Sequence, residues 1–138
     1  MSQLTDIKVD DLTFFSKKYR FKVTYVFLSL YYNTRFFFSF FLKEHENIMD
    51  VTELYPSAGF LQREAWDEFG IKFIDYEKKR NIIQRRLLMD YGFKGHPLKK
   101  NFPLTGFVEI VYNQEKRRIV MIPLCLLQEY RKFSFKDF

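Results

Sequence analysis

Cysteine, histidine and glycine are scarce in this sequence of 138 residues. Its one cysteine, Cys125, excludes a disulfide within the chain and favours a reducing compartment. The two histidines, His45 and His96, lie far apart in the sequence, and there is no second cysteine to help Cys125 bind a metal. Because a metal site gathers three or four such ligands, the sequence predicts no metal-ligating residue.

Catalytic and nucleotide-binding patterns are also missing. The five glycines form neither GxGxxG nor GxxxxGK[ST], which excludes the standard phosphate-binding loops. Cys125 and His96 would be the only nucleophile and base of that type. However, Cys125 lies between Leu124 and Leu126, where a buried thiol is the simpler interpretation. We therefore predict no catalytic and no cofactor-binding residue. The first eleven residues hold three aspartates and no apolar run, unlike a secretion signal or a transit peptide.

Aromatic and basic residues are abundant. Hydrophobic residues make up 47% of the chain, and 18 are phenylalanine, which is more than enough to fill one core. We expect a single domain over residues 1–138, with apolar surface left over for a partner. The formal net charge of +6 is compatible with phosphate, anionic lipid or an acidic protein as that partner, and it identifies none of them.

Residues 21–42 are rich in Val, Phe and Tyr and are interrupted by Asn33, Thr34 and Arg35. This pattern predicts an antiparallel hairpin. The alternative is one membrane helix over residues 23–42, which is long enough to cross a bilayer. An arginine near the middle of such a helix would cost about 2.5 to 3.5 kcal/mol, so the hairpin is preferred.

Helices and further strands follow from periodicity. Short helices are predicted over residues 11–19 and 58–69, the second capped by Ser57 or a neighbour and ended by Gly70. Another apolar stripe, in residues 82–91, predicts a helix that ends at Gly92. Strands are expected at residues 48–54 and 71–75, and a second hairpin at 105–123. The mixed order predicts an α+β fold with helices on one face of a sheet.

RNA binding is the alternative function. Residues 106–110, GFVEI, imitate the end of an RNA-recognition strand. The opening basic-glycine-aromatic triplet is absent, because Pro103, Leu104 and Thr105 stand there. Ile110 also occupies the place of an aromatic residue that would stack on a base, so only half of the motif is present.

Three longer motifs resemble one family. They are LQREAWDEFGI at residues 61–71, LLMDYGFKGHPLKKNFPLTGFVEI at 87–110, and MIPLCLLQEYRKFSF at 121–135. Together with the strand pair upstream, they resemble the 30-kilodalton subunit of respiratory complex I, NADH:ubiquinone oxidoreductase. This is the family of mitochondrial subunit 9 and its bacterial counterpart, and the resemblance extends from about residue 25 to residue 135.

The resemblance implies a non-catalytic subunit of the peripheral arm of complex I. It implies a ferredoxin-like α+β domain with an extended C-terminal segment, short for the family at its N-terminus. Iron-sulfur clusters, FMN and ubiquinone would belong to partner subunits, and this chain would hold none. The expected partners are a 49-kilodalton-type quinone-module subunit and its iron-sulfur neighbour, with no nucleic acid and with membrane contact only through the complex. The expected location is the matrix side of the mitochondrial inner membrane, in an organelle-encoded protein, or the cytoplasmic side of a bacterial plasma membrane.

The chain departs from the family pattern in places. Residues 74–81 are lysine-rich where the family has a Gly-His-Pro loop, and Gln62, Lys99 and Asn101 replace charged family residues. These changes weaken or remove particular ion pairs.

The motif residues are the candidate interface. Within the first motif, the spacing of Arg63 and Asp67 predicts an ion pair along one helical face, and Trp66 is either a core residue or an anchor. In the second motif, glycines and Pro97 predict a fixed turn, His96 a hydrogen bond within or across it, and the lysines Lys94, Lys99 and Lys100 a charged surface for a partner. The predicted interface residues are Arg63, Glu64, Trp66, Asp67, Gly70, Asp90, Tyr91, Gly92, Gly95, His96, Pro97, Lys99 and Pro103.

Overall fold

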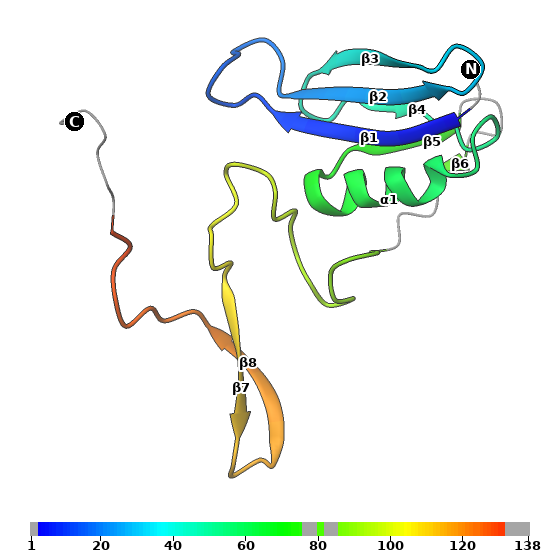
Figure 1. Cartoon of the computed structure of the whole chain (residues 1–138). Coiled ribbons are helices and arrows are strands. Elements are labelled where there is room, and N and C mark those ends of the chain that lie inside the picture. The colour runs from blue at the N-terminus through cyan, green and yellow to red at the C-terminus, as the bar shows by residue number, and fades with distance from the viewer. Residues whose placement is uncertain (1–2, 76–79, 82–85, 132–138) are drawn as a thin grey trace. The chain divides into compact units, whose positions relative to one another are not determined.

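The structure is a computed structural model, and it describes residues 3–75, 80–81 and 86–131. It contains two compact units, residues 1–102 and 103–138, and each is described by itself. The α+β class is confirmed, because the first unit combines antiparallel and mixed sheets with a helix on one side (Figure 1). A single domain over the whole chain stays a prediction.

Three long strands form the first sheet. They are β1 (Gln3–Asp11), β2 (Phe21–Ser29) and β3 (Thr34–Leu42), in the antiparallel order β1-β2-β3. The predicted hairpin is therefore confirmed, and Asn33 turns the chain with a positive φ of 49°. The membrane-helix alternative is wrong for these residues. In the part of the chain that the structure describes, no helix has the length and apolar character needed to cross a bilayer.

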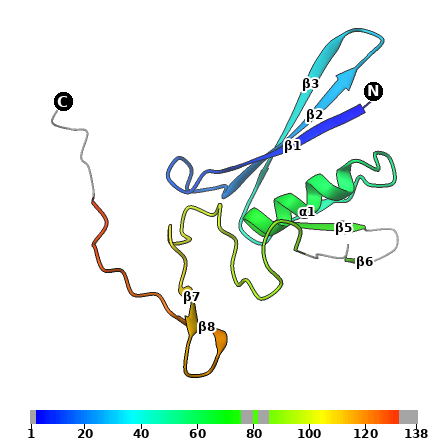
Figure 2. The ribbon, with the colours of Figure 1, turned by 60° about the horizontal axis from the view of Figure 1, so that its bottom comes forward.

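A strand-helix-strand unit follows. Strand β4 (Asn47–Met49) pairs in parallel with β5 (Lys72–Asp75), and helix α1 (Ala58–Phe69) connects them (Figure 2). The short strand β6 (Arg80–Asn81) pairs antiparallel with β5. The strand expected over residues 48–54 is thus shorter than predicted, because the chain turns at Thr52.

Helix α1 matches its predicted limits. Gly70 follows it in the left-handed conformation, with a φ of 74°, and its amide donates to the carbonyl of Trp66. Glycine tolerates this conformation because it has no Cβ. The predicted cap is wrong. Ser57 makes no side-chain cap, and its hydroxyl donates instead to the carbonyl of Leu4 on β1 at 3.2 Å.

The core lies between the first sheet and α1. Alternate residues of β2, namely Phe21, Val23 and Tyr25, are buried, since successive side chains of a strand point to opposite faces. They pack with Leu4 and Ile7 of β1, with Ala58 and Ala65 of α1, and with Ile71 and Phe73. Fully burying one large apolar side chain stabilises the fold by roughly 1.5 to 3 kcal/mol.

Two of the predicted helices do not form as expected. Residues 11–19 do not form a helix, because Asp11 ends β1 and residues 12–20 form a loop that is closed by a hydrogen bond from the amide of Leu12 to the carbonyl of Arg20. The described part of the stripe at residues 82–91, residues 86–91, consists of bends and turns. Residues 82–85 lie outside the described residues.

The second unit is built around a hairpin. Strands β7 (Val108–Asn113) and β8 (Arg118–Pro123) pair antiparallel, which confirms the second predicted hairpin. Residues 124–131 continue without regular structure. Cys125 is exposed, so the prediction of a buried thiol is wrong. That prediction rested on the flanking leucines, but Leu126 is itself exposed and Leu124 is only half-buried.

Candidate functional site

A buried carboxylate near the C-terminal end of α1 organises the second motif. Asp67 is fully buried, and its Oδ1 pairs with Nη1 of Arg86 at 2.7 Å. Its Oδ2 accepts three consecutive backbone amides, those of Leu87, Leu88 and Met89, at 3.0, 2.9 and 3.1 Å. One side chain of the helix therefore fixes the path of a segment twenty residues later in the chain.

Arg86 extends this arrangement into the following loop. Its Nη2 donates to the carbonyls of Phe93 at 3.1 Å and Gly95 at 2.8 Å, while Nη1 also reaches the carbonyl of Asp67 at 3.2 Å. The guanidinium lies over the rings of Trp66 and Phe93, at 5.3 and 5.5 Å from their centroids. A planar group with five donors is suited to this combination of several acceptors and two aromatic faces.

His96 closes the loop back onto the helix. Its Nδ1 lies 3.0 Å from the carbonyl oxygen of Asp67, and its ring makes an edge contact with Trp66 at 5.8 Å between centroids. The ring also fills the space beside Gly70, where an added Cβ would lie 2.7 Å from Cδ2 of His96. We refer to Asp67, Arg86, Trp66 and His96, with the amides of residues 87–89, as the Asp67 cluster.

The loop satisfies the last carbonyls of α1. The carbonyl of Asp67 accepts from Arg86, and that of Glu68 accepts the amide of Leu98 at 3.1 Å. The carbonyls at the end of a helix have no partner within the helix, and the helix dipole favours positive charge there. The Arg86 guanidinium supplies both a donor and a charge.

The pKa shifts follow from these contacts. Burial raises the pKa of Asp67, but the hydrogen bonds from Arg86 and three amides outweigh it, and the pKa lies below its ordinary value. Burial lowers the pKa of His96, and the positive charges of Lys99 and Arg86 act in the same direction. At neutral pH, His96 is therefore a neutral ring beside a charged pair.

A second buried carboxylate ties the end of this loop to the first sheet. Asp11 accepts the amide of Lys100 at 2.9 Å, both the amide and the hydroxyl of Thr13, and Nη2 of Arg20 at 3.1 Å. Arg20 also donates to Asn101. Burial opposes these hydrogen bonds, but they prevail and the pKa of Asp11 is lowered.

Several predicted residues gather in or beside the Asp67 cluster. The predicted pair of Arg63 with Asp67 is wrong, because Asp67 is occupied by Arg86, and Arg63 reaches the carbonyl of Arg86 at 3.4 Å. Trp66 is half-buried against Arg86 and His96. The predicted hydrogen bond of His96 is made across to the helix. The other members of this group are Gly70, Gly95 and Pro97, all half-buried.

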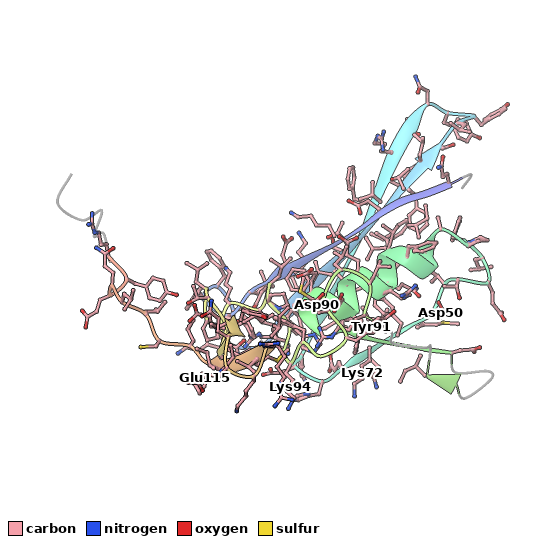
Figure 3. All side chains as sticks on the ribbon, turned by 90° about the horizontal axis from the view of Figure 1, so that it is seen from below. Asp50, Lys72, Asp90, Tyr91, Lys94 and Glu115 are labelled. Carbon is pink, nitrogen blue, oxygen red and sulfur yellow. The ribbon has the colours of Figure 1, made fainter. Side chains whose placement is uncertain are left out.

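Other predicted residues face solvent. Asp90, Tyr91 and Gly92 are exposed on the loop beside α1, together with Lys94 (Figure 3), and Glu64 is exposed on the helix. Lys99 is not a free charge, because its Nζ lies over the ring of Phe21 and 3.9 Å from Glu44. Pro103 is exposed at the start of the second unit.

Sequence reasoning missed the two arginines and the carboxylate that hold the loop. Arg86 lies four residues before Asp90, a spacing that favours a pair within one helix. Asp11 and Arg20 also gave no signal, since their partners Lys100 and Asn101 follow 89 and 81 residues later in the chain. Among the described residues, no group of three or more His, Cys, Asp or Glu side chains is placed to hold a metal ion.

The second unit presents an apolar surface instead of a polar site. On one face of the hairpin, Val108, Ile110 and Tyr112 lie opposite Pro123, Met121 and Ile119. All but Pro123 belong to the large exposed apolar side chains. The opposite face is mixed, since Glu109, Val111 and Asn113 lie opposite Ile122, Val120 and Arg118. We call Val108, Ile110, Tyr112, Ile119 and Met121 the apolar hairpin face.

A family model described as "Respiratory-chain NADH dehydrogenase, 30 Kd subunit" matches residues 1–108. The chain belongs to this family. An NADH dehydrogenase [ubiquinone] iron-sulfur protein 3 from Beta trigyna is 45% identical over 120 residues, which cover 87% of this chain and 60% of the relative. An NADH-quinone oxidoreductase subunit from Jannaschia sp. (strain CCS1) is 42% identical over 134 residues, 97% of this chain and 61% of the relative.

A third 30 Kd subunit relative is an NADH-ubiquinone oxidoreductase subunit 9 from Reclinomonas americana. It is 44% identical over 119 residues, which cover 86% of this chain and 56% of that protein. The chain described here therefore spans about 60% of the length of the curated relatives that it matches. The matched residues 1–108 include the whole Asp67 cluster and all of the Asp11 contacts. The RNA-binding alternative finds no support in these matches.

Proposed function

We propose that this chain is a non-catalytic subunit of the peripheral arm of complex I. Its role is to support assembly, and electron transfer from NADH to ubiquinone, by packing on the subunits of the quinone module. The family match supports membership of complex I. The exposed apolar surface of the chain supports a role in packing on other subunits. The partners in this proposal are a 49-kilodalton-type subunit and its iron-sulfur neighbour.

The observation that carries the proposal is the apolar hairpin face. An isolated two-stranded hairpin is marginal in water, and it needs packing against another surface for stability. Here five large apolar side chains on one face are exposed. Contiguous apolar surface of this kind marks a protein-protein contact in a soluble protein. A subunit that is held in place by a partner accounts for it.

The Asp67 cluster fits the same role. It uses a buried ion pair, three amides and two aromatic rings to hold one loop in a single conformation. The exposed Tyr91 and Lys94 are thereby presented on a fixed backbone, which lowers the conformational entropy lost on binding. This role does not require any of these groups to take part in a chemical reaction.

We also propose that iron-sulfur clusters, FMN and ubiquinone bind to partner subunits. A cluster of the usual type is held by four cysteine thiolates, and this chain has one cysteine. The location in this proposal is the matrix side of the mitochondrial inner membrane, for an organelle-encoded chain, or the cytoplasmic side of a bacterial plasma membrane. Contact with the membrane is made through the complex.

A paired substitution on the hairpin tests the docking role. Ile110 and Met121 lie directly opposite each other, so replacing both by serine removes the centre of the apolar hairpin face. We expect the fraction of the chain found in a large assembly on a native gel to fall at least tenfold, since central apolar contacts dominate interface energy. Glu109→Gln, on the other face, is the control and keeps wild-type incorporation. Normal incorporation of the double serine variant would refute docking through this face.

A further inference from the structure

An apolar groove opens beside the covered part of the first sheet. Its volume is about 610 Å³, within the range of cavities that bind ligands or partner side chains. It lies between the inner face of β2 and β3 on one side and the β4 segment on the other. Its lining consists of Tyr25, Phe27, Phe38, Phe40, Leu42, Asn47, Ile48, Met49 and Val51.

The groove exists because α1 covers only part of the sheet. The helix packs mainly against β1, and β3 is the edge strand on the far side of β2. Phe38 and Phe40 of β3 therefore remain about half exposed, at 45% and 50%, although they lie on the same face as buried Tyr25 and Val23. This strip continues the core face of the sheet, but the described residues leave it uncovered.

Two polar groups are buried behind this apolar lining. The ring of Tyr25 lines the groove, but its hydroxyl is buried, as are both amide atoms of Gln62 on α1. Burial raises the pKa of Tyr25 to about 12, with the charge of Asp50 adding to the shift and the neighbouring Gln62 amide opposing it. The surface that an occupant meets is therefore almost entirely apolar.

The segment that contributes β4 to the groove is acidic. Residues 43–54 contain Glu44, Glu46, Asp50 and Glu53 but only one lysine, Lys43, and of the four acidic residues Glu44 lies 3.9 Å from Lys99. The whole chain carries a formal charge of +6, so this segment reverses the local sign. Asp50 is labelled in Figure 3, in the loop that follows β4. Complementary charge steers association and fixes the register of a partner, which favours a basic partner here.

The length of the groove suits a short helix. Phe38, Phe40 and Leu42 are alternate residues of one strand and span roughly 13 Å, at about 3.3 Å per residue. A helix rises about 1.5 Å per residue, so about nine residues cover this distance in two and a half turns. Such a helix would lie beside α1 and complete the cover of the sheet, as layered folds require.

We propose that this groove binds an amphipathic helix of a basic partner protein. The helix has an apolar stripe that packs on the lining of the groove, and lysine or arginine on the flank that faces residues 43–54. A second copy of this chain offers no such helix among its described residues, because α1 is packed in its own core. The inference rests on the proposed role as an assembly subunit and adds one partner surface to it.

Photo-crosslinking on the two faces of β3 tests the inference. A tagged chain carries p-benzoylphenylalanine at Phe40, which lines the groove, or at Phe41, which lies on the opposite face of the strand. After irradiation of the native assembly, the crosslinked peptides are sequenced by mass spectrometry. The inference predicts that position 40, and not position 41, reaches a peptide with apolar residues at helical spacing and flanking lysines or arginines. A copy of this chain, an acidic or alternating peptide, a lipid adduct, or no adduct at position 40 would overturn it.

A chain that assembles normally but captures nothing at position 40 removes this inference alone, whereas a chain that enters no assembly removes the proposed function.

Discussion

Asp67 is the residue on which the second motif depends most. Its carboxylate is completely buried, yet every contact is made with a donor, namely one guanidinium and three amides. Such a group is stable only while all of its partners remain, because an uncompensated buried charge is expensive. Loss of this carboxylate is therefore expected to lower the free energy of unfolding and not the rate of a reaction.

Asp67→Asn should destabilise the first unit by about 3 to 5 kcal/mol, the range for removing one partner of a buried ion pair. The amide keeps the shape but leaves Arg86 without its counter-charge and turns a donor toward other donors. Thermal or urea unfolding of the full chain measures the change. Asp90→Asn is the control, since Asp90 is exposed and such changes stay within about 0.5 kcal/mol. Equal stability of the two variants would contradict the cluster's structural role.

His96 should give the chain a pH dependence near neutrality. Its pKa is lowered from 6.5 in the fold, chiefly by burial, so the unfolded chain takes up the proton first as the pH falls. The contribution of the neutral ring is complete above about pH 6.5 and declines as the pH falls toward the folded-state value. Urea midpoints between about pH 7.5 and 5.5 should therefore drop more steeply for the wild type than for His96→Gln.

The exposed histidine provides the control for this prediction. His45 is exposed and has a positive φ of 68°, which asparagine tolerates, so His45→Asn is the matched histidine substitution that leaves the His96 ring in place. The raised pKa of Glu68 affects all three proteins equally and cancels in the comparison. Parallel slopes for the wild type and His96→Gln would show that the ring does not carry the effect.

At the level of elements, local sequence patterns predicted the strands and the helix that local interactions stabilise. Both hairpins and α1 follow from alternation, helical spacing and a terminal glycine. The helix expected over residues 11–19 was wrong because Asp11 binds Thr13, Arg20 and Lys100, and the last of these is distant in sequence. In the same way, three amides of residues 87–89 bind Asp67 where a helix would have used them internally. Long-range side-chain contacts overrode periodicity in both places.

The junction between α1 and β5 depends on a glycine. Gly70→Ala should destabilise the chain by about 1 to 2 kcal/mol from its left-handed φ alone, with an added cost because the new Cβ meets the His96 ring. Thermal unfolding measures the loss. Gly59→Ala is the matched control inside α1. There a Cβ would find only ordinary contact, so a gain of about 0.5 to 1 kcal/mol is expected. A neutral Gly70→Ala would contradict the close packing of His96 against this junction.

At the level of the whole molecule, composition predicted apolar surface for a partner, while the net charge identified no partner and neither predicted the contacts. The excess of phenylalanine indicated apolar surface for a partner, and the structure places much of it on β3 and on the hairpin. The sequence could not show which side chains of β3 line a groove, because that depends on how far α1 extends over the sheet. The candidate residues Arg63, Trp66 and His96 were found through the motifs, but their common partner Arg86 was not.

The proposed role as a subunit of an NADH-oxidising assembly can be tested in membranes. A native gel of detergent-solubilised membranes, from cells that carry a tagged chain, is stained for NADH oxidation and probed for the tag. We expect the tag to migrate with the NADH-oxidising band and this band to disappear when the chain is depleted. A tag found only at the size of the free chain, with the NADH-oxidising band intact after depletion, would show that the chain is not a subunit of that assembly.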